Sequence, residues 1–184
     1  DLIRDALGAL MNEDCQVIML GSGLTELEEW MKWAEGQYPD RFRGWVGFSI
    51  PMAHRITAGV DIFLMPSRFE PCGLNRLYSM RYGTLPVAHA TGGLRDTIKQ
   101  HNPFADISKP EEVGEVGTGW LFDNMSTQDF IEATKWSIHV FKEKKDVWRA
   151  MQVQAMTQDL SWNKKAAEWE QIFDWAKVDP PHCT

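Results

Sequence analysis

The sequence lacks the features that mark several classes of protein. No apolar run approaches the length that crosses a bilayer, so we expect no membrane span. Lys and Arg are not in excess, because the net charge is -7, and we therefore expect no binding to nucleic acid or to anionic lipid. A Walker-type loop, a Ser-His-Asp order and internal repeats are also missing. The apolar share of 43% and the charged share of 24% are those of an ordinary globular domain.

Cysteine is scarce as well. Cys15, Cys72 and Cys183 are far apart, and no C-x-x-C spacing occurs. The odd number and the wide spacing argue against a disulfide framework and against a zinc site. We therefore expect no bound metal, and a reducing compartment fits best.

What is present is an alternation of helical patterns with short apolar runs. Apolar residues recur at helical spacing over 2–10, and turn residues bound each apolar run. The predicted strands are 16–20, 45–48, 61–65 and 85–88, with helices between them. This order predicts an α/β fold, a Rossmann-like parallel sheet with helices on both faces. With 184 residues, the chain is long enough for one domain, residues 1–184.

Capping residues set the expected helix boundaries. Thr25 with Glu28 forms a capping box, and Pro51 opens a helix that closes near Gly59. The polar segment 100–118 is expected to be a loop, and Trp120 starts a short strand at best. A helical tail over about 126–177 follows, with helices at about 126–142, 145–157 and 161–177 that begin at Ser126 and Ser161.

Tryptophan is abundant, with nine residues, and four of them lie in the helical tail: Trp148, Trp162, Trp169 and Trp175. Packing between helices is the interpretation that we prefer. The alternative is a platform for carbohydrate, because flat aromatic faces stack on sugar rings.

Two turns follow strands at the edge where parallel sheets bind ligands. The first, Gly21-Ser22-Gly23, is a weak signal, because such turns commonly only reverse the chain. In the second, over 66–75, Glu70 and Pro71 precede Gly73 at the start of a helix. The free N–H groups of that helix would attract a diphosphate, and Glu70 could accept hydrogen bonds from sugar hydroxyls. Physical reasoning alone leaves open that Glu70 is merely an acid favoured by the helix dipole.

Two further histidines are candidates. His54 and Arg55 lie on a helix that could line the same cleft, and His89 follows a strand. For each, a structural or solvated role remains the alternative.

The middle of the chain resembles a known family. The segments are AHRITAG at 53–59, DIFLMPSRFEPCGLN at 61–75, LYSMRYGTLPV at 77–87 and GGLRDT at 92–97, followed by GTGW at 117–120 and AAEWEQIF at 166–173. They resemble the plant and algal starch synthases and the bacterial glycogen synthases, which use ADP-glucose. The tail is most similar to the class I soluble form. The likeness covers nearly the whole chain.

The resemblance implies a fold and a set of site residues. The family has the GT-B architecture, in which two Rossmann-like domains face a cleft, and this chain would be the carboxy-terminal, sugar-nucleotide half. Glu70 would contact the hydroxyls of the transferred glucose and be the catalytic residue. The residues that would bind substrate are Gly47 and Phe48, beside the adenine, and Cys72, Gly73, Leu74 and Asn75, around the glucose and the distal phosphate.

The sequence departs from the family pattern at residue 76. Arg76 stands where the family has Gln, and a cation there could help or crowd the diphosphate. Residue 78 is Tyr where many GT-B enzymes have a second glutamate, as expected for this branch. The family's basic residues for the diphosphate and its amino-terminal domain are not in these 184 residues. We therefore expect the chain to be part of a longer enzyme and to be inactive alone.

The resemblance implies transfer of glucose from ADP-glucose to the non-reducing end of an α-1,4-glucan, amylopectin or amylose, with retention of configuration and no cofactor. Two alternatives stay open. One is a relative that uses UDP-glucose, and the other is a catalytically inactive homologue that binds glucan or acts as a scaffold. The family also implies a plastid location, in chloroplast or amyloplast, or a cytoplasmic one in lineages that make starch or glycogen in the cytosol.

Overall fold

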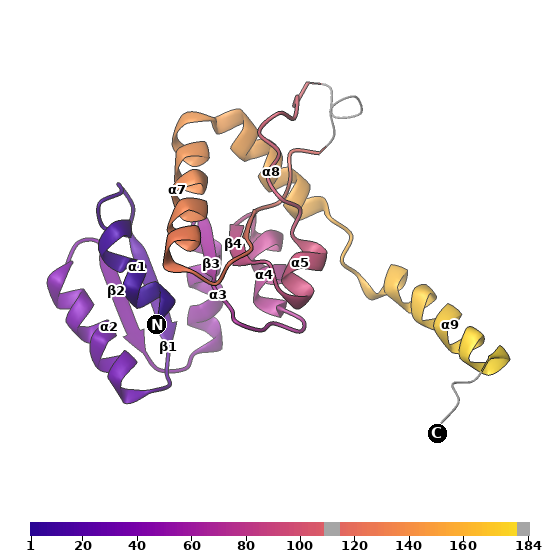
Figure 1. Cartoon of the computed structure of the whole chain (residues 1–184), viewed down its shortest axis with the longest axis horizontal. Helices are drawn as coiled ribbons and strands as arrows, with labels where there is room; N and C mark the ends of the chain where they lie inside the picture. Colours follow the sequence, from indigo (N-terminus) through magenta and orange to yellow (C-terminus); the bar gives the residue numbers. More distant parts are fainter. Residues whose placement is uncertain (109–114, 180–184) are drawn as a thin grey trace.

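The computed structural model describes residues 1–108 and 115–179, which form a mixed α/β body and a projecting carboxy-terminal helix (Figure 1). The elements within these residues are, in chain order, α1 (Leu2–Leu10), β1 (Val17–Gly21), α2 (Thr25–Gln37), β2 (Phe42–Val46), α3 (Ile50–Gly59), β3 (Ile62–Met65), α4 (Leu74–Tyr82), β4 (Leu85–His89), α5 (Gly92–Thr97), β5 (Trp120–Phe122), α7 (Thr127–Glu143), α8 (Lys145–Thr157) and α9 (Trp162–Val178).

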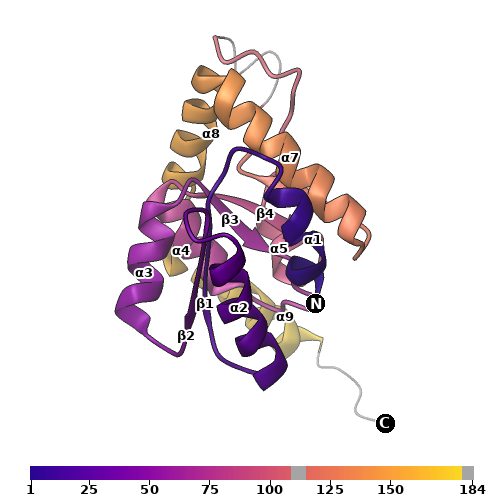
Figure 2. The same cartoon turned by 90° about the vertical axis from the view of Figure 1, so that its left-hand side faces the viewer.

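All strand pairs are parallel, as predicted, and they form two separate hydrogen-bonded groups. β1 pairs with β2, where Val17 lies opposite Phe42. The second group has the order β3-β4-β5, with Ile62 opposite Leu85 and Val87 opposite Trp120. Figure 2 shows the β1–β2 pair in front of the β3–β4 group.

β4 is the most deeply buried strand because helices pack on both of its faces. Leu85 and Val87 belong to one core cluster with Phe130 of α7. Ala88, on the opposite face, packs in a second cluster with Leu94 of α5. The prediction of a parallel sheet covered by helices on both faces is therefore confirmed for this group.

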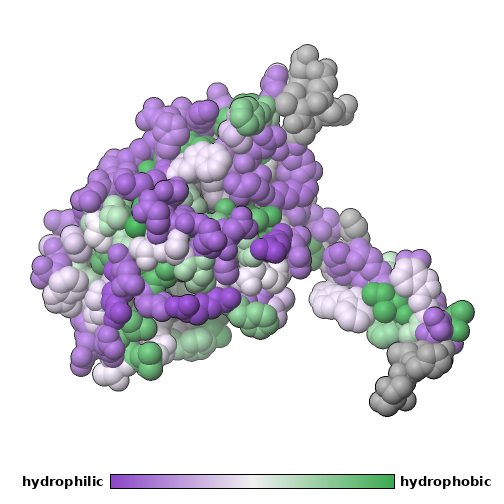
Figure 3. Space-filling view, viewed as in Figure 1, coloured by the Kyte–Doolittle hydropathy of each residue, from purple (hydrophilic) through white to green (hydrophobic). Residues whose placement is uncertain are grey.

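The helical tail has two parts with different packing. Trp148 of α8 stacks on Trp120 of β5 with ring centroids 5.7 Å apart, which confirms helix packing for this tryptophan. α9 projects away from the body, and hydrophobic residues lie on its surface (Figure 3). Trp162, Trp169 and Trp175 are all exposed there. For these three the packing interpretation is wrong within the described residues, because no other element covers α9.

The boundaries of α2 and β2 differ from the prediction. α2 has Leu24, in an extended conformation, as its N-cap, so Thr25 is the first helical residue and not the cap. Glu28 instead accepts a hydrogen bond from the N–H of Gly23 at 2.9 Å. β2 begins at Phe42, three residues before the predicted start, and ends before Gly47.

The short helix α5 was not predicted. Its first residues are Gly92 and Gly93, which are poor helix formers, so the local sequence gives little helical signal. None of the helices over 1–108 and 115–179 is long and apolar enough to cross a membrane.

Candidate functional site

The loops that follow the strands gather at one edge of the molecule. β1 and β2 are parallel, and so are β3 and β4, so the carboxyl ends of each group point the same way. Gly21, the last residue of β1, and Pro66, directly after β3, line one cavity, which shows that the two groups share this edge. In parallel α/β sheets this is the edge where ligands bind.

The loop between β3 and α4 presents a carboxylate beside a helix start. Glu70 Oε1 accepts a hydrogen bond from the N–H of Gly73 at 2.9 Å. Gly73 is the N-cap of α4 with φ 70°, in the left-handed region that glycine adopts without strain. The N–H groups of Leu74 and Asn75 have no acceptor within the described part of the chain. These groups and the dipole of α4 make a site suited to an anion.

The start of α5 supports this loop from behind. The N–H of Gly93 donates to the carbonyl of Glu70 at 3.0 Å. A Cβ atom at Gly92 would lie 2.4 Å from the same carbonyl oxygen, and one at Gly93 would lie 2.9 Å from the carbonyl oxygens of Pro71 and Cys72. Only glycine lets the backbone of α5 approach the 70–72 backbone this closely, so Gly92 and Gly93 fix the position of the Glu70 loop.

Arg76 lies beneath the loop and not in front of it. Only 2% of its surface is exposed, and its Nη1 donates to the carbonyl of Gly93. Burial lowers the pKa of Arg76, while the nearby Cys72, Glu70 and Asp96 act in the opposite direction. Its Nε has no hydrogen-bond partner among the described residues. Arg76 therefore joins α4 to α5 under the anion site and does not crowd the outer surface.

Gly47 and Phe48 lie in the other strand group. The N–H of Gly47 donates to the carbonyl of Gly21 at 2.9 Å, so these residues continue the β1–β2 pair. Phe48 is 84% exposed. Within the described residues no hydrogen bond or ring contact joins Phe48 to the 70–75 loop. The structure thus brings Glu70, Cys72, Gly73, Leu74 and Asn75 together and places Gly47 and Phe48 separately at the same edge.

The other candidates have structural neighbours. His54 Nδ1 lies 3.2 Å from the hydroxyl of Tyr82, and its ring lies 5.4 Å from that of Tyr78, so this side chain of α3 packs against α4. Arg55 is exposed. His89 Nδ1 lies 2.8 Å from the carbonyl oxygen of Ser67, and its Nε2 lies 3.2 Å from that of Asp123. His89 therefore links the loops after β3 and β5.

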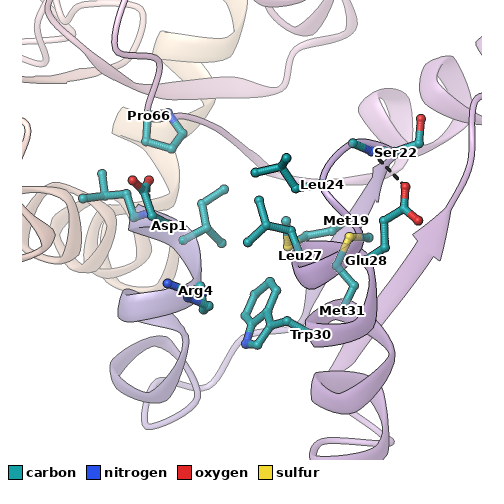
Figure 4. A pocket seen from close by; sticks show the side chains of 14 residues that line it. Asp1, Arg4, Met19, Ser22, Leu24, Leu27, Glu28, Trp30, Met31 and Pro66 are labelled. Carbon is teal, nitrogen blue, oxygen red and sulfur yellow. Dashed lines mark hydrogen bonds between the residues drawn. The ribbon is translucent and has the colours of Figure 1, made fainter.

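A cavity of about 300 Å³ lies beside the Gly21–Gly23 turn (Figure 4). Its walls are mainly apolar, with Leu24, Leu27 and Trp30 on one side and Pro66 on the other. The sequence indicated the turn but not the cavity, because the cavity depends on how α1 and α2 pack. Among residues 1–108 and 115–179, no three His, Cys, Asp or Glu side chains cluster closely enough to hold a metal ion.

Known proteins resemble this chain in sequence. A family model, glycosyl transferases group 1, matches residues 1–139. Soluble starch synthase 1, chloroplastic/amyloplastic, from Solanum tuberosum is 50% identical over 99% of this chain and 28% of its own length. Starch synthase 1 from Triticum aestivum is 52% identical over 99% of this chain and 27% of its length. The chain thus spans less than a third of these relatives.

Solved structures resemble it in fold. The catalytic domain of starch synthase IV from Arabidopsis thaliana, bound to ADP and acarbose, matches with a TM-score of 0.75 and 29% identity, over 95% of this chain and 35% of that one. A sucrose-phosphate synthase from Thermosynechococcus elongatus matches in fold alone, with a TM-score of 0.60 and 16% identity over 96% of this chain and 42% of its own. The fold is that of the GT-B glycosyltransferases. The chain belongs to the group 1 glycosyltransferase family.

Proposed function

We propose that a longer protein containing this chain is a starch synthase, which transfers glucose from ADP-glucose to the non-reducing end of an α-1,4-glucan with retention of configuration. The observation that carries the proposal is the position of Glu70, whose carboxylate lies at the start of α4 beside the unpaired N–H groups of Leu74 and Asn75. A hexose and a diphosphate need such neighbours: an acceptor for hydroxyls and donors for phosphate oxygens.

Each residue of the loop has a role in this proposal. Glu70 accepts hydrogen bonds from the glucose hydroxyls and is the catalytic residue. Cys72, Gly73, Leu74 and Asn75 surround the glucose and the distal phosphate, largely through backbone N–H groups. Gly47 and the exposed ring of Phe48 lie against the adenine. All these residues follow β2 or β3, at one edge of the molecule.

The chemistry follows from the charge that develops in the transition state. As the glycosidic bond to the diphosphate breaks, the sugar gains oxocarbenium character and the leaving diphosphate gains negative charge. The N–H groups and the dipole at the start of α4 stabilise that charge without reorganising. Arg76 adds a buried positive charge under the same turn.

The relatives support the donor, the acceptor and the location. Starch synthase IV, the solved neighbour, was bound to ADP and to acarbose. The relatives at 50–52% identity are named chloroplastic/amyloplastic, and we propose a plastid location for this protein as well. They are much longer than this chain, which supports an additional domain on its amino-terminal side as the partner that completes the cleft. We propose that residues 1–184 act as one nucleotide-sugar domain of that enzyme.

The test is a substitution in a longer protein that contains this chain. Glu70→Gln keeps the size of the side chain but removes the charge that the sugar hydroxyls contact. We expect kcat/KM with ADP-glucose to fall at least about a hundredfold. Glu35→Gln is the matched control, because Glu35 also accepts a backbone N–H, from Gly44 at 3.3 Å, but lies on α2. Unchanged transfer by the Glu70 variant, with an unaltered melting temperature, would refute the role.

Two alternatives predict other results in the same assay. A UDP-glucose-dependent relative would turn over UDP-glucose faster than ADP-glucose. An inactive glucan-binding homologue would retain binding to amylopectin but transfer no glucose from either donor. The 50% identity to starch synthase 1 favours the ADP-glucose enzyme.

A further inference from the structure

Arg76 places a buried positive charge at the start of α4. Only 2% of its surface is exposed, and a Cβ atom at Gly73, the N-cap of this helix, would lie 3.6 Å from its Nη1. Arginine stays protonated in proteins, so burial does not remove the charge. A guanidinium therefore lies beside the turn to which the free N–H groups of Leu74 and Asn75 belong.

The surrounding chain gives this charge little compensation. Within the described residues, Arg76 donates one hydrogen bond, from Nη1 to the carbonyl of Gly93, and its Nε has no partner. Glu70 and Asp96 carry carboxylates nearby, but neither forms an ion pair with Arg76 in this part of the chain. Glu70 Oε1 instead accepts the N–H of Gly73, and Asp96 is exposed. A buried cation without a contacting counter-ion disfavours the folded state.

The hydrogen bond that Arg76 makes is not needed to satisfy its acceptor. The carbonyl of Gly93 also accepts a hydrogen bond from the hydroxyl of Thr97 at 2.5 Å. A variant without the guanidinium would therefore leave this carbonyl with a donor. Holding α4 to α5 is thus a weak reason for a charge here, since an apolar side chain of similar length would fill the space without the cost of desolvation.

The charge balance of the turn gives a better reason. The segment 70–76 contains one acid, Glu70, and one base, Arg76. Without Arg76 the segment would carry a net negative charge and repel an anion at the start of α4. With Arg76 the two charges offset each other, and the helix dipole and the free N–H groups can attract one.

We propose that the charge of Arg76 serves an anionic ligand, and that the diphosphate of a nucleotide sugar at the start of α4 is its counter-ion. The ligand's identity rests on the proposed function. The N–H groups of Leu74 and Asn75 contact the phosphate oxygens, while the guanidinium acts on the same charge through the turn. Coulomb interactions are strong in such a poorly solvated place. Arg76 is then a specificity-determining residue that favours ligands of high negative charge.

The alternative is that Arg76 only ties α4 to α5 through Gly93. The two roles make opposite predictions for the ligand-free protein. If the charge serves a ligand, a neutral side chain relieves the desolvation of the guanidinium, and the melting temperature stays the same or rises. If Arg76 is a tie, the same substitution lowers the melting temperature.

The test is Arg76→Met in a longer protein that contains this chain, with inorganic pyrophosphate as the probe. Methionine replaces the stem of the arginine but carries no charge. We expect the Kd of pyrophosphate, measured by isothermal titration calorimetry, to rise at least about tenfold. The melting temperature without ligand should not fall. Arg76→Gln, which keeps an N–H donor without the charge, gives a second measurement with the same expectation.

Arg81 provides a matched control on the same helix. Its Nη1 also donates to a backbone carbonyl, that of Met156 at 2.6 Å, but Arg81 is exposed and lies in the last turn of α4. Arg81→Met should change the Kd of pyrophosphate by less than about twofold, because an exposed, distant charge is screened. An equal loss of affinity in the Arg76 and Arg81 variants would contradict a local role for Arg76.

The outcomes separate this inference from the proposed function. An unchanged Kd in the Arg76 variants would overturn the inference, and so would weaker binding together with a lower melting temperature, which is the result expected of a structural tie. Weaker pyrophosphate binding in a protein that transfers no glucose from ADP-glucose would leave the role of Arg76 in place and count against the starch synthase proposal. Glucose transfer with a Kd that does not depend on Arg76 would do the reverse.

Discussion

The two strand groups are built alike but buried differently. In the β3-β4-β5 group, residues 85–88 are all buried, between α7 on one face and α5 on the other. In the β1–β2 group, Ile18 and Trp45 are exposed, although β1 is as apolar as β3 and both groups are parallel. Burial here depends on which elements lie beside a strand, and not on the strand's own sequence. The same substitution should therefore cost much more in one group than in the other.

The largest difference is expected between two tryptophans. Trp120 of β5 is fully buried and stacks on Trp148, whereas Trp45 of β2 is exposed. Trp120→Ala should lower the free energy of unfolding in urea by about 3–5 kcal/mol, because it leaves a cavity. Trp45→Ala should cost about 1 kcal/mol, because little area returns to water.

Trp120→Phe refines this comparison. The indole N–H of Trp120 has no acceptor among the described residues, so replacing it loses no hydrogen bond. We expect Trp120→Phe to lower the free energy of unfolding by less than Trp120→Ala does. Equal costs for Trp120→Ala and Trp45→Ala would break the comparison.

The next largest difference in stability is expected between alanine substitutions at two glycines, Gly92 and Gly21. A Cβ atom at Gly92 would lie 2.4 Å from the carbonyl oxygen of Glu70, and its φ is +43°. Gly92→Ala should therefore destabilise the protein by about 2 kcal/mol or more, measured by thermal unfolding. A Cβ at Gly21, which ends β1, would meet nothing within 4 Å, so Gly21→Ala should stay within about 0.5 kcal/mol. A mild effect at Gly92 would show that the Glu70 loop can move.

The third comparison is between a buried and an exposed histidine, and it concerns how the free energy of unfolding depends on pH. His101 is buried between the rings of Trp120 and Trp136, and its Nδ1 lies 3.1 Å from the carbonyl oxygen of Val116. Burial lowers the pKa of His101 below its ordinary value of 6.5, and Lys144 lowers it further. Below about pH 6.5 the imidazole is protonated in the unfolded chain but stays neutral in the folded chain. The free energy of unfolding therefore falls as the pH is lowered, by at most about 1.4 kcal/mol per pH unit.

His101→Gln should flatten this dependence between pH 7 and about pH 5. His139, which is exposed on α7, is the control, and His139→Gln should leave the slope as it is. Urea unfolding at a series of pH values measures both variants. An unchanged slope in the His101 variant would assign the effect to other groups.

The smallest expected difference concerns two thiols. Cys72 is exposed in the Glu70 loop, whereas Cys15, before β1, is half-buried and lies 3.4 Å from the carbonyl oxygen of Leu10. Burial raises the pKa of Cys15, which leaves less of the reactive thiolate. In a Cys183→Ser background, a maleimide should label Cys72 at least about ten times faster than Cys15. ADP should slow labelling of Cys72 alone, and equal protection of both would argue against a local site.

The sequence predicted the parallel α/β order, since apolar runs alternate with helical patterns and turns. It located α4 and the Glu70 loop, because Pro71 and Gly73 mark a helix start. The sequence did not predict α5, because the helix begins with two glycines whose place depends on close approach to residues 70–72, about twenty residues earlier in the chain. The burial of Arg76 was also not predictable, because its neighbour Gly93 comes from a different helix. Thr25 is not the cap, because α2 already begins at this residue and has Leu24 as its N-cap.

The aromatic residues show the same limit. Trp148 and the tryptophans of α9 have similar helical contexts, yet among the described residues only Trp148 meets a ring from the sheet. Periodicity identifies a helix, but the presence of a covering partner decides whether its aromatic side is core or surface.

The exposed indoles of α9 give the protein a built-in optical reporter. Trp162, Trp169 and Trp175 are open to solvent, as are Trp33 and Trp45, whereas Trp120 and Trp148 are shielded, so dissolved acrylamide should quench the exposed indoles and spare the buried ones. Any molecule that settles on α9 would shield its indoles and shift their emission to shorter wavelength. Docking there could thus be followed by fluorescence without attaching a dye.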